Sequence, residues 1–442
     1  MQTAIALEDA GRFAEAAVAY QSLADAGNRA AEFNLARMHL TSGHVVAAGI
    51  LFGRIVAREP ENIPALHALA MARLDGGRTY EAVALLRRIV DLEPTAERWR
   101  DLCFYSLHLP GDHDALHREA AAIHPTTPAP RSTWDGVRPI RVGYICPDAP
   151  TVYPFFLPVL AAHSKKNVDA ILYCDGEIHD EFCETHVCFN VKTATDEELA
   201  EMIRDDEIDV LVNLKDRRIG TMALHPAPLM YSWIGYPSWL GVDGVEPIVD
   251  QWAYRPYGID LTPAPATVNG YITFGCVNRA CKITDEVAQT WGKILVAVPD
   301  SWLKVLAVSG ELNTDVRDLL VRNGVPADRL ILCPQSERAG YLALINSLDI
   351  ALDPWPYCGT TTTCDCLWQG VPVVTMAGNS IRHRVGERVL TQIEVTCAAT
   401  TDNASSRDMM RQWRRSQMSL MGDGDRVAAA LENRWMDVLQ TC

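Results

Sequence analysis

The sequence predicts an all-α helical-repeat domain followed by two doubly wound α/β lobes. Three observations predict this fold class: a 34-residue period in the first third of the chain, a proline-rich break after it, and short apolar runs alternating with amphipathic stretches beyond the break. The length of 442 residues allows two or three domains. With 48% hydrophobic and 22% charged residues, the chain has the material for folded cores.

Composition and charge exclude several classes of function. A formal net charge of −16 argues against a nucleic-acid partner held by bulk charge, because such binding rests on clustered lysines and arginines. No apolar run approaches the roughly 20 residues that cross a bilayer. The N-terminal segment lacks the basic and apolar regions of a signal peptide. We therefore expect a cytoplasmic protein with no membrane span and no nucleic-acid partner.

The 13 cysteines predict neither a disulfide framework nor a zinc site. An odd count spread over a long chain without a secretion signal is not typical of a disulfide scaffold. Cys364 and Cys366 form a C-x-C pair, but a second ligand pair at ordinary spacing is missing. We expect most cysteines to be small apolar packing residues.

The first third of the chain repeats with a period of 34 residues. Gly43 and Gly77 lie one period apart, as do Pro60 and Pro94, and small and apolar residues recur at the same offset. A glycine at the turn, small residues on one helix and a proline after the second helix are typical of tetratricopeptide repeats. Residues 1–124 are therefore expected to hold two full repeats with incomplete ones on either side. An ordinary helical bundle is the alternative.

Residues 125–138 are interpreted as a linker, because they contain three prolines and no periodicity. Beyond the linker, apolar runs alternate with helical stretches, which favours parallel sheets covered on both faces. A Pro- and Gly-rich break at 257–269 divides this part into lobes at 139–258 and 270–400, with C-terminal helices at 401–442. Strands are expected at 140–146, 170–174, 208–213, 271–274, 302–306, 330–333, 350–353 and 373–375, and helices at 285–298 and 341–347.

The strongest local signal lies in the second lobe, where a strand ending at Asp353 runs through a tight Pro/Gly turn into four threonines. Thr360–Thr363 directly follow Gly359 and open an apolar helix. A helix N-terminus presents unpaired N–H groups and a partial positive charge, which suit a phosphate, and the hydroxyls add further donors. A simple threonine N-cap is the alternative, but four consecutive threonines exceed what capping needs.

Three further side chains are candidates for the same site. Asp365 lies five residues into the helix, where it can accept hydrogen bonds from ribose hydroxyls or merely compensate the helix dipole. Tyr341 begins a helix and offers an aromatic face to a base, or simply packs. Lys282 follows a strand end and can neutralise a leaving diphosphate, although most lysines are solvated surface residues. No DxD-like carboxylate pair accompanies these strand ends, so the sequence calls for no metal.

Five segments together resemble the O-linked N-acetylglucosamine transferase family of the SPINDLY type, glycosyltransferase family 41. They follow the repeats and have the sequences RVGYICPD, HPAPLMYSWIGYPSWLG, YITFGCVNRACKI, DIALDPWPYCGTTTTCDCLWQGVPVVT and RHRVGERVL. The resemblance covers residues 1–400, is most specific at 271–390, and is loose between 153 and 209. It implies a GT-B fold with the donor in the C-terminal lobe, and an inverting, metal-independent transfer from a UDP-sugar without a cofactor.

The resemblance also implies roles for individual residues. Lys282 matches the family lysine that stabilises the diphosphate, and Gly359–Thr362 match the donor phosphate turn. Asp365 matches the ribose-binding aspartate. Tyr341 stands where the family usually has a histidine beside the uracil, and Arg338 where a family lysine can lie near the nucleotide. The expected nucleotide-binding set is Asn278, Arg279, Arg338, Tyr341, Gly359, Thr360, Thr361, Thr362 and Asp365, with Lys282 as the catalytic residue.

The first lobe departs from the family pattern. The family's histidines are missing from Asp148–Phe156 and from Asn213–Gly220, and the stretch after Asp250 is short. The general base that would take the acceptor's proton is therefore unassigned. A thiol acceptor, which needs little deprotonation, is one hypothesis that does without such a base. The candidates for the base by location are Asp148, Tyr153, Asp216 and His225.

The leading hypothesis is a glycosyltransferase that moves N-acetylglucosamine or glucose from a UDP-sugar to a protein side chain. Ser or Thr is the simplest acceptor, with Asn and Cys left open. The repeats and the inter-lobe cleft would bind the peptide, because solenoids form grooves, although docking or a homodimer is an alternative role of the repeats. A second hypothesis is a degenerate scaffold that binds a nucleotide sugar without turning it over. A third is a transferase with a small-molecule or glycan acceptor.

Overall fold

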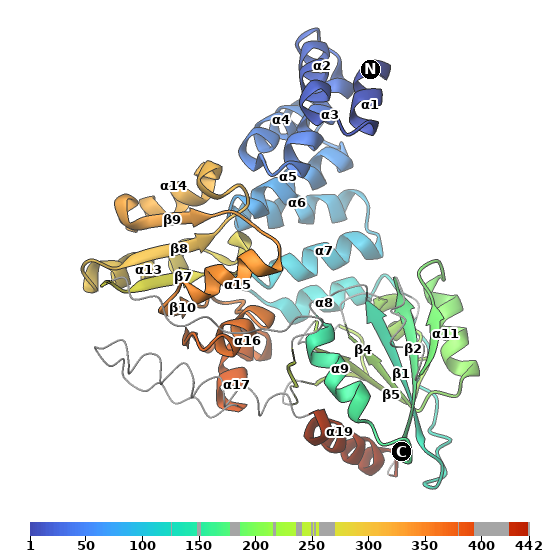
Figure 1. Ribbon diagram of the computed structural model, residues 1–442. Helices are drawn as coiled ribbons and strands as arrows, with labels where there is room; N and C mark the ends of the chain where they lie inside the picture. Colours follow the sequence, from blue (N-terminus) through green and yellow to red (C-terminus); the bar gives the residue numbers. More distant parts are fainter. Residues whose placement is uncertain are drawn as a thin grey trace.

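The architecture was obtained as a computed structural model. It describes residues 1–124, 126–147, 152–176, 186–214, 218–235, 241–248, 251, 253–255, 270–378, 380–392 and 424–440. A stack of helices at the N-terminal end is followed by two α/β lobes, with the second lobe beside the middle of the stack (Figure 1). This order of elements confirms the predicted fold class.

The first 121 residues form helix pairs joined by tight turns. Gly43 and Gly77 sit in two of these turns with φ of 78° and 73°, a region that favours glycine, so the periodic glycines have a backbone role. The pairs α3–α4 and α5–α6 lie at the positions predicted for the two full repeats, with α1–α2 before them and α7–α8 after them. The helices are α1 (Gln2–Asp9), α2 (Phe13–Asp25), α3 (Arg29–Thr41), α4 (Val45–Arg58), α5 (Ile63–Asp75), α6 (Thr79–Leu92), α7 (Ala96–Ser106) and α8 (His113–Ala121).

The repeats are docked on the second lobe through the turn between α5 and α6. Thr79 at the start of α6 donates a buried hydrogen bond to the carbonyl oxygen of Cys281 at 2.6 Å. Asn313 donates to the carbonyl oxygen of Asp75 at 2.9 Å. Cys281 itself packs in an apolar cluster made otherwise of repeat residues. The repeats and the second lobe therefore share core packing.

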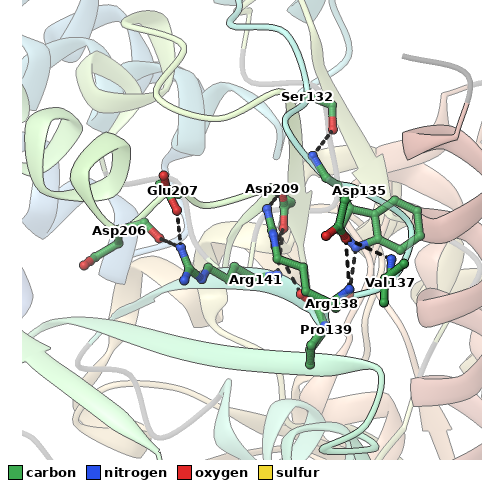
Figure 2. Close-up of polar contacts among 10 residues, drawn as sticks. Ser132, Asp135, Val137, Arg138, Pro139, Arg141, Asp206, Glu207 and Asp209 are labelled. Carbon is green, nitrogen blue, oxygen red and sulfur yellow. Dashed lines mark hydrogen bonds and ion pairs between the residues drawn. The ribbon is translucent and has the colours of Figure 1, made fainter.

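The segment before the first strand is fixed to the first lobe through Asp209 (Figure 2). Both terminal nitrogens of Arg138 donate to the Asp209 carboxylate, at 2.6 and 2.9 Å, and the backbone N–H of Arg141 donates to it at 2.9 Å. Trp134 Nε1 donates to the carbonyl oxygen of Arg138 at 2.9 Å. The carboxylate is 1% exposed, so these bonds explain a charged residue beside an apolar strand. The predicted linker thus ends in an ordered contact.

The first lobe is a parallel six-stranded sheet in the order β3-β2-β1-β4-β5-β6. Three of its strands were not predicted: β3 and β6 are short edge strands, and β5 lies in a proline-rich motif. Helix α9 packs against the C-terminal helix α19. The elements are β1 (Ile140–Pro147), α9 (Tyr153–Ala162), β2 (Val168–Asp175), β3 (Val187–Asn190), α11 (Asp196–Asp205), β4 (Val210–Asn213), α12 (Ile219–Ala223), β5 (Leu229–Trp233), β6 (Val245–Ile248) and α19 (Gly424–Leu439).

The second lobe is a parallel five-stranded sheet in the order β11-β10-β7-β8-β9. Chain direction switches between β7 and β10, and ligands of such sheets bind at the carboxyl ends of the strands at this point. The elements are β7 (Thr273–Cys276), η1 (Ala280–Lys282), α13 (Asp285–Ala297), β8 (Trp302–Leu306), η2 (Gly310–Leu312), α14 (Thr314–Arg322), η3 (Ala327–Arg329), β9 (Leu330–Cys333), α15 (Arg338–Asn346), β10 (Ile350–Leu352), α16 (Thr361–Trp368), β11 (Val373–Val374), η4 (Ile381–Arg384) and α17 (Val385–Gln392).

Some predicted bounds are wrong by a few residues. The strand expected from residue 271 begins at Thr273, because Tyr271 is a surface residue, 40% exposed. Tyr341 does not begin a helix: α15 starts three residues earlier at Arg338, and its polar first turn hid the start. Strand β10 ends at Leu352, one residue before Asp353. The Asp353 carboxylate accepts a hydrogen bond from the backbone N–H of Gly359 in the following turn.

The apolar cores account for most cysteines, as predicted. Of the ten cysteines in the described ranges, eight are buried and two are half-buried. No helix in those ranges is long and apolar enough to cross a membrane. Of the C-terminal helices expected at 401–442, residues 401–423 and 441–442 lie outside the described residues. The predicted inter-lobe break at 257–269 also lies outside them.

Candidate active site

A cavity of about 370 Å³ opens at the switch point of the second sheet. One wall comes from the second lobe, one from the first lobe and one from the end of α7 in the repeats. Such convergence of domains on one concave, largely apolar pocket with a few polar groups is typical of a ligand site. The cavity is lined by Phe104, His108, Val152, Phe155, Ile234, Gly235, Val277, Asn278, Arg279, Lys282, Tyr341, Tyr357, Thr360, Thr361 and Thr362.

Lys282 is fixed by the short η1 turn that follows β7. Its Nζ donates to Asn278 Oδ1 and to the carbonyl oxygen of Cys358, both at 3.1 Å, and lies 4.8 Å from the centre of the Tyr357 ring. These neutral acceptors hold the ammonium in place without cancelling its charge. A cation held in this way can stabilise negative charge that develops on a leaving group.

The threonine turn follows β10 on the neighbouring strand. Helix α16 begins at Thr361, and the Thr360 side chain makes no capping hydrogen bond, which counts against the simple N-cap interpretation. Thr363 donates instead to the carbonyl oxygen of Gly359 at 3.0 Å. A Cβ on Gly359 would lie 2.9 Å from the Thr363 hydroxyl and 3.0 Å from Asn278, so the turn is tight enough to require glycine. Gly359 itself lies just behind the cavity wall.

Asp353 connects the threonine turn to the loop that carries Asn278 and Lys282. Its Oδ1 accepts from the backbone N–H of Gly359 at 2.7 Å and from Asn278 Nδ2 at 3.4 Å, and its Oδ2 accepts from the Thr375 hydroxyl at 2.8 Å. The side chain is 4% exposed. Burial raises the pKa of Asp353 to about 6, although these hydrogen bonds and Lys282 favour the charged form.

We expect Asp353→Asn to flatten the pH dependence of stability. The raised pKa means that the fold favours the neutral carboxyl. The contribution of Asp353 to the free energy of unfolding is therefore full below about pH 4 and lost as the pH rises through about 6, by about 3 kcal/mol. Urea unfolding of wild type and variant at pH 4, 5, 6 and 7 measures this. Asp328→Asn, on an exposed turn, is the control, and equal slopes for the two variants would contradict the expectation.

Asp365 lies behind the cavity in α16 and is 1% exposed. Arg338 donates to both of its oxygens, at 2.8 and 2.5 Å, and Tyr254 of the segment after the first lobe donates its hydroxyl at 2.5 Å. Burial raises the pKa of Tyr254, so its hydroxyl stays protonated as the donor. Arg338 also lies 5.3 Å above the ring of Tyr341, which lines the cavity. The predicted ribose and base contacts thus form one connected group.

Two of the four candidates for a general base can be placed, and neither lines the cavity. Tyr153 is buried, and its hydroxyl donates to the carbonyl oxygen of Pro147 at 3.1 Å. Both ring nitrogens of His225 lie within hydrogen-bond distance of backbone carbonyl oxygens, at 3.0 and 2.7 Å. Asp148 and Asp216 lie outside the described residues.

Comparison with known protein families finds a match over part of the chain. Residues 266–419 match the model of glycosyl transferase family 41. The chain carries a glycosyltransferase family 41 domain. This confirms the family expected from the sequence motifs, and all ten predicted site residues lie inside the family 41 domain.

Relatives of the family 41 domain are found in plants. The chain is 32% identical over 310 residues to a probable UDP-N-acetylglucosamine–peptide N-acetylglucosaminyltransferase SPINDLY of Oryza sativa, covering 59% of this chain and 33% of that protein. It is 26% identical over 298 residues to the SEC protein of Arabidopsis thaliana, which has the same kind of name, covering 57% and 30%. The chain thus spans about a third of the length of these relatives.

A solved structure shares the fold of the whole chain. A mutant of the Thermobaculum terrenum O-GlcNAc transferase superimposes with a TM-score of 0.83 over 99% of this chain and 97% of that one, at 24% sequence identity. This likeness confirms the GT-B arrangement behind helical repeats, with the family 41 domain as its second lobe.

Seven of the ten predicted residues line the cavity, while Arg338, Gly359 and Asp365 lie behind it. Arg279 lines the cavity but also faces the repeats, where it donates to Asp75 Oδ1 at 3.2 Å. Sequence reasoning missed Val277 and Tyr357, the four cavity residues of the first lobe (Val152, Phe155, Ile234 and Gly235), and the two from the repeats, Phe104 and His108. Nothing local marked the latter pair, because the cavity that they line is formed by residues far along the chain.

Proposed function

We propose that the chain is an inverting glycosyltransferase that moves N-acetylglucosamine from UDP-N-acetylglucosamine to a peptide side chain. The observation that carries the proposal is Lys282, held by two neutral acceptors in the wall of a cavity that the threonine turn also lines. The names of the plant relatives support this donor and this acceptor class. Glucose as the sugar, and Asn or Cys as the acceptor, are the other outcomes to test.

The groups around the cavity suggest how transfer would proceed. The diphosphate would accept hydrogen bonds from the N-terminus of α16 and from the hydroxyls of Thr360–Thr362, with Lys282 beside it. The acceptor oxygen would form a bond to the anomeric carbon as the bond to the β-phosphate oxygen breaks. Charge then grows on the diphosphate, where a fixed cation lowers the barrier most. No step requires a metal or a cofactor.

The direct test is calorimetric titration without added metal, with UDP, UDP-N-acetylglucosamine, UDP-glucose and GDP-fucose as ligands. We expect UDP and its N-acetylglucosamine conjugate to bind. Thr361→Val should weaken UDP binding by about tenfold, because it removes a hydroxyl that would bond a charged group. Thr290→Val in α13, whose hydroxyl donates to the carbonyl oxygen of Glu286 within the helix, is the matched control and should leave binding unchanged.

The acceptor is tested with peptide arrays carrying Ser, Thr, Asn or Cys, read by transfer of a radiolabelled sugar. Transfer to Ser and Thr is the expected result. Binding of the donor without transfer to any peptide, protein or small-molecule acceptor would leave a nucleotide-sugar-binding scaffold. Failure of every nucleotide to bind would overturn the transferase proposal.

A further inference from the structure

Lys282 and Arg279 both line the cavity, but the partners that hold them differ in charge. Lys282 Nζ donates to two neutral acceptors, so its charge is not cancelled. Arg279 Nη2 donates at 3.2 Å to Oδ1 of Asp75, a carboxylate at the end of α5 in the helical repeats. Among the described residues that line the cavity, none is a carboxylate. The negative charge of Asp75 therefore reaches the edge of the cavity from another domain.

The docking of this turn on the second lobe does not depend on the Asp75 carboxylate. The backbone carbonyl oxygen of Asp75 accepts a hydrogen bond at 2.9 Å from Nδ2 of Asn313, a fully buried residue. Four residues further along the chain, the Thr79 hydroxyl donates to the carbonyl oxygen of Cys281 at 2.6 Å. Replacing the carboxylate with an amide would therefore remove a charge beside Arg279 while these two contacts remain.

The ion pair between Arg279 and Asp75 is one that a bound anion can break. The two side chains are 52% and 24% exposed, and ion pairs in contact with solvent contribute little free energy. A guanidinium forms stronger, charge-assisted hydrogen bonds with a phosphate, whose geometry it matches. A diphosphate in the cavity would therefore compete with Asp75 for the Arg279 guanidinium, and the energy needed to separate the pair would be subtracted from the affinity.

We propose that Asp75, contributed by the helical repeats, competes with the diphosphate of the donor for Arg279 and so lowers the affinity of the cavity for the donor. The inference rests on the proposed function, because it concerns the regulation of the same site. Coupling between two binding events is reciprocal. A bound donor therefore weakens the contact between Arg279 and the repeats by the same factor by which Asp75 weakens donor binding.

The test is calorimetric titration of wild type and Asp75→Asn with UDP at low ionic strength. We expect the variant to bind UDP about three- to fivefold more tightly, because Arg279 no longer has to leave a carboxylate. The gain should shrink in about 0.5 M salt, which screens exposed charges. Glu81→Gln is the matched control and should bind as wild type does, since the Glu81 carboxylate is paired with Arg73 and Arg78 inside the repeats.

A double-mutant cycle shows whether the effect of Asp75 passes through Arg279. In the Arg279→Ala background, Asp75→Asn should change the affinity for UDP by less than about twofold, because no guanidinium is left to release. A purely structural role of Asp75 predicts the opposite sign in the single variant, since a loosened turn beside the cavity would weaken the binding of UDP. The tighter binding of Asp75→Asn and its dependence on Arg279 therefore identify competition.

Two results would overturn the inference and leave the transferase proposal standing. One is binding of UDP by Asp75→Asn that is equal to or weaker than that of wild type. The other is a gain of the same size in the Arg279→Ala background, which would mean that Asp75 acts without the arginine. Failure of the wild-type chain to bind any of the nucleotides would instead overturn the proposed function, and the inference with it.

Discussion

Replacing Lys282 with alanine is expected to lower the transfer rate by about 10²–10³-fold while changing the affinity for UDP by less than about tenfold. The diphosphate carries more negative charge as it leaves than it does in the bound donor, so a nearby cation stabilises the transition state more than the ground state. Nζ is held by two acceptors at 3.1 Å, so it needs no rearrangement when that charge appears. Single-turnover transfer and calorimetry with UDP measure the two quantities separately.

Lys304→Ala is the matched control for this variant. Lys304 lies on β8 of the same lobe and donates to the Ser347 hydroxyl at 2.9 Å, outside the cavity wall. Its loss should leave the rate of transfer within about twofold, since its ammonium is bonded to Ser347 and does not line the cavity. If Lys282→Ala transferred sugar as fast as Lys304→Ala, leaving-group stabilisation would have to come from the threonine turn alone.

The α/β organisation of the two lobes could be predicted from the apolar patterns of their central strands. Strands buried on both faces, such as β1 and β4, are almost continuous apolar runs, and these were predicted. The missed strands β3 and β6 are edge strands with exposed or polar positions, including Val187, Glu246 and Pro247. An edge strand is stabilised by pairing on one side only, so its sequence need not be apolar, and proline is tolerated there.

The candidate site also contains residues that could be predicted from the local sequence and residues that could not. The phosphate turn and Lys282 were predictable because each is a local motif at a strand end. His108 was not, since its place in the cavity depends on docking of the repeats against residues such as Tyr357, far along the chain. The pairing of Asp365 with Arg338 and Tyr254 is likewise a tertiary contact. Sequence reasoning assigned Asp365 a ribose contact but did not anticipate these partners.

Replacing Arg338 with alanine is expected to lower the free energy of unfolding by about 3 kcal/mol at pH 7. Asp365 is 1% exposed, and Arg338 is the cation that neutralises it, with both terminal nitrogens bonded to the carboxylate. Removing the arginine leaves a buried charge whose described partner is a neutral hydroxyl, that of Tyr254. The Arg338 side chain is 33% exposed, which keeps the effect at the lower end for buried pairs. Urea unfolding measures the change.

The control is Arg322→Ala, which breaks an ion pair with Asp285 in which the two side chains are 58% and 44% exposed. Such pairs contribute less than about 1 kcal/mol. The double variant Arg338→Met with Asp365→Asn should recover most of the lost stability, because it removes both charges together. Its affinity for UDP should be lower than that of wild type, since the amide that replaces the carboxylate exchanges one acceptor oxygen for a donor.

The loss of stability in Arg338→Ala also shows how many acceptor positions of Asp365 are open to the hydroxyls of a ribose. A carboxylate offers about four acceptor positions, and Arg338 and Tyr254 fill three of them. A large loss of stability would mean that the pair persists when the donor binds, which leaves one position for a ribose hydroxyl. A loss no larger than that of Arg322→Ala would mean that the pair separates easily, so that ribose hydroxyls can displace the guanidinium and take both oxygens.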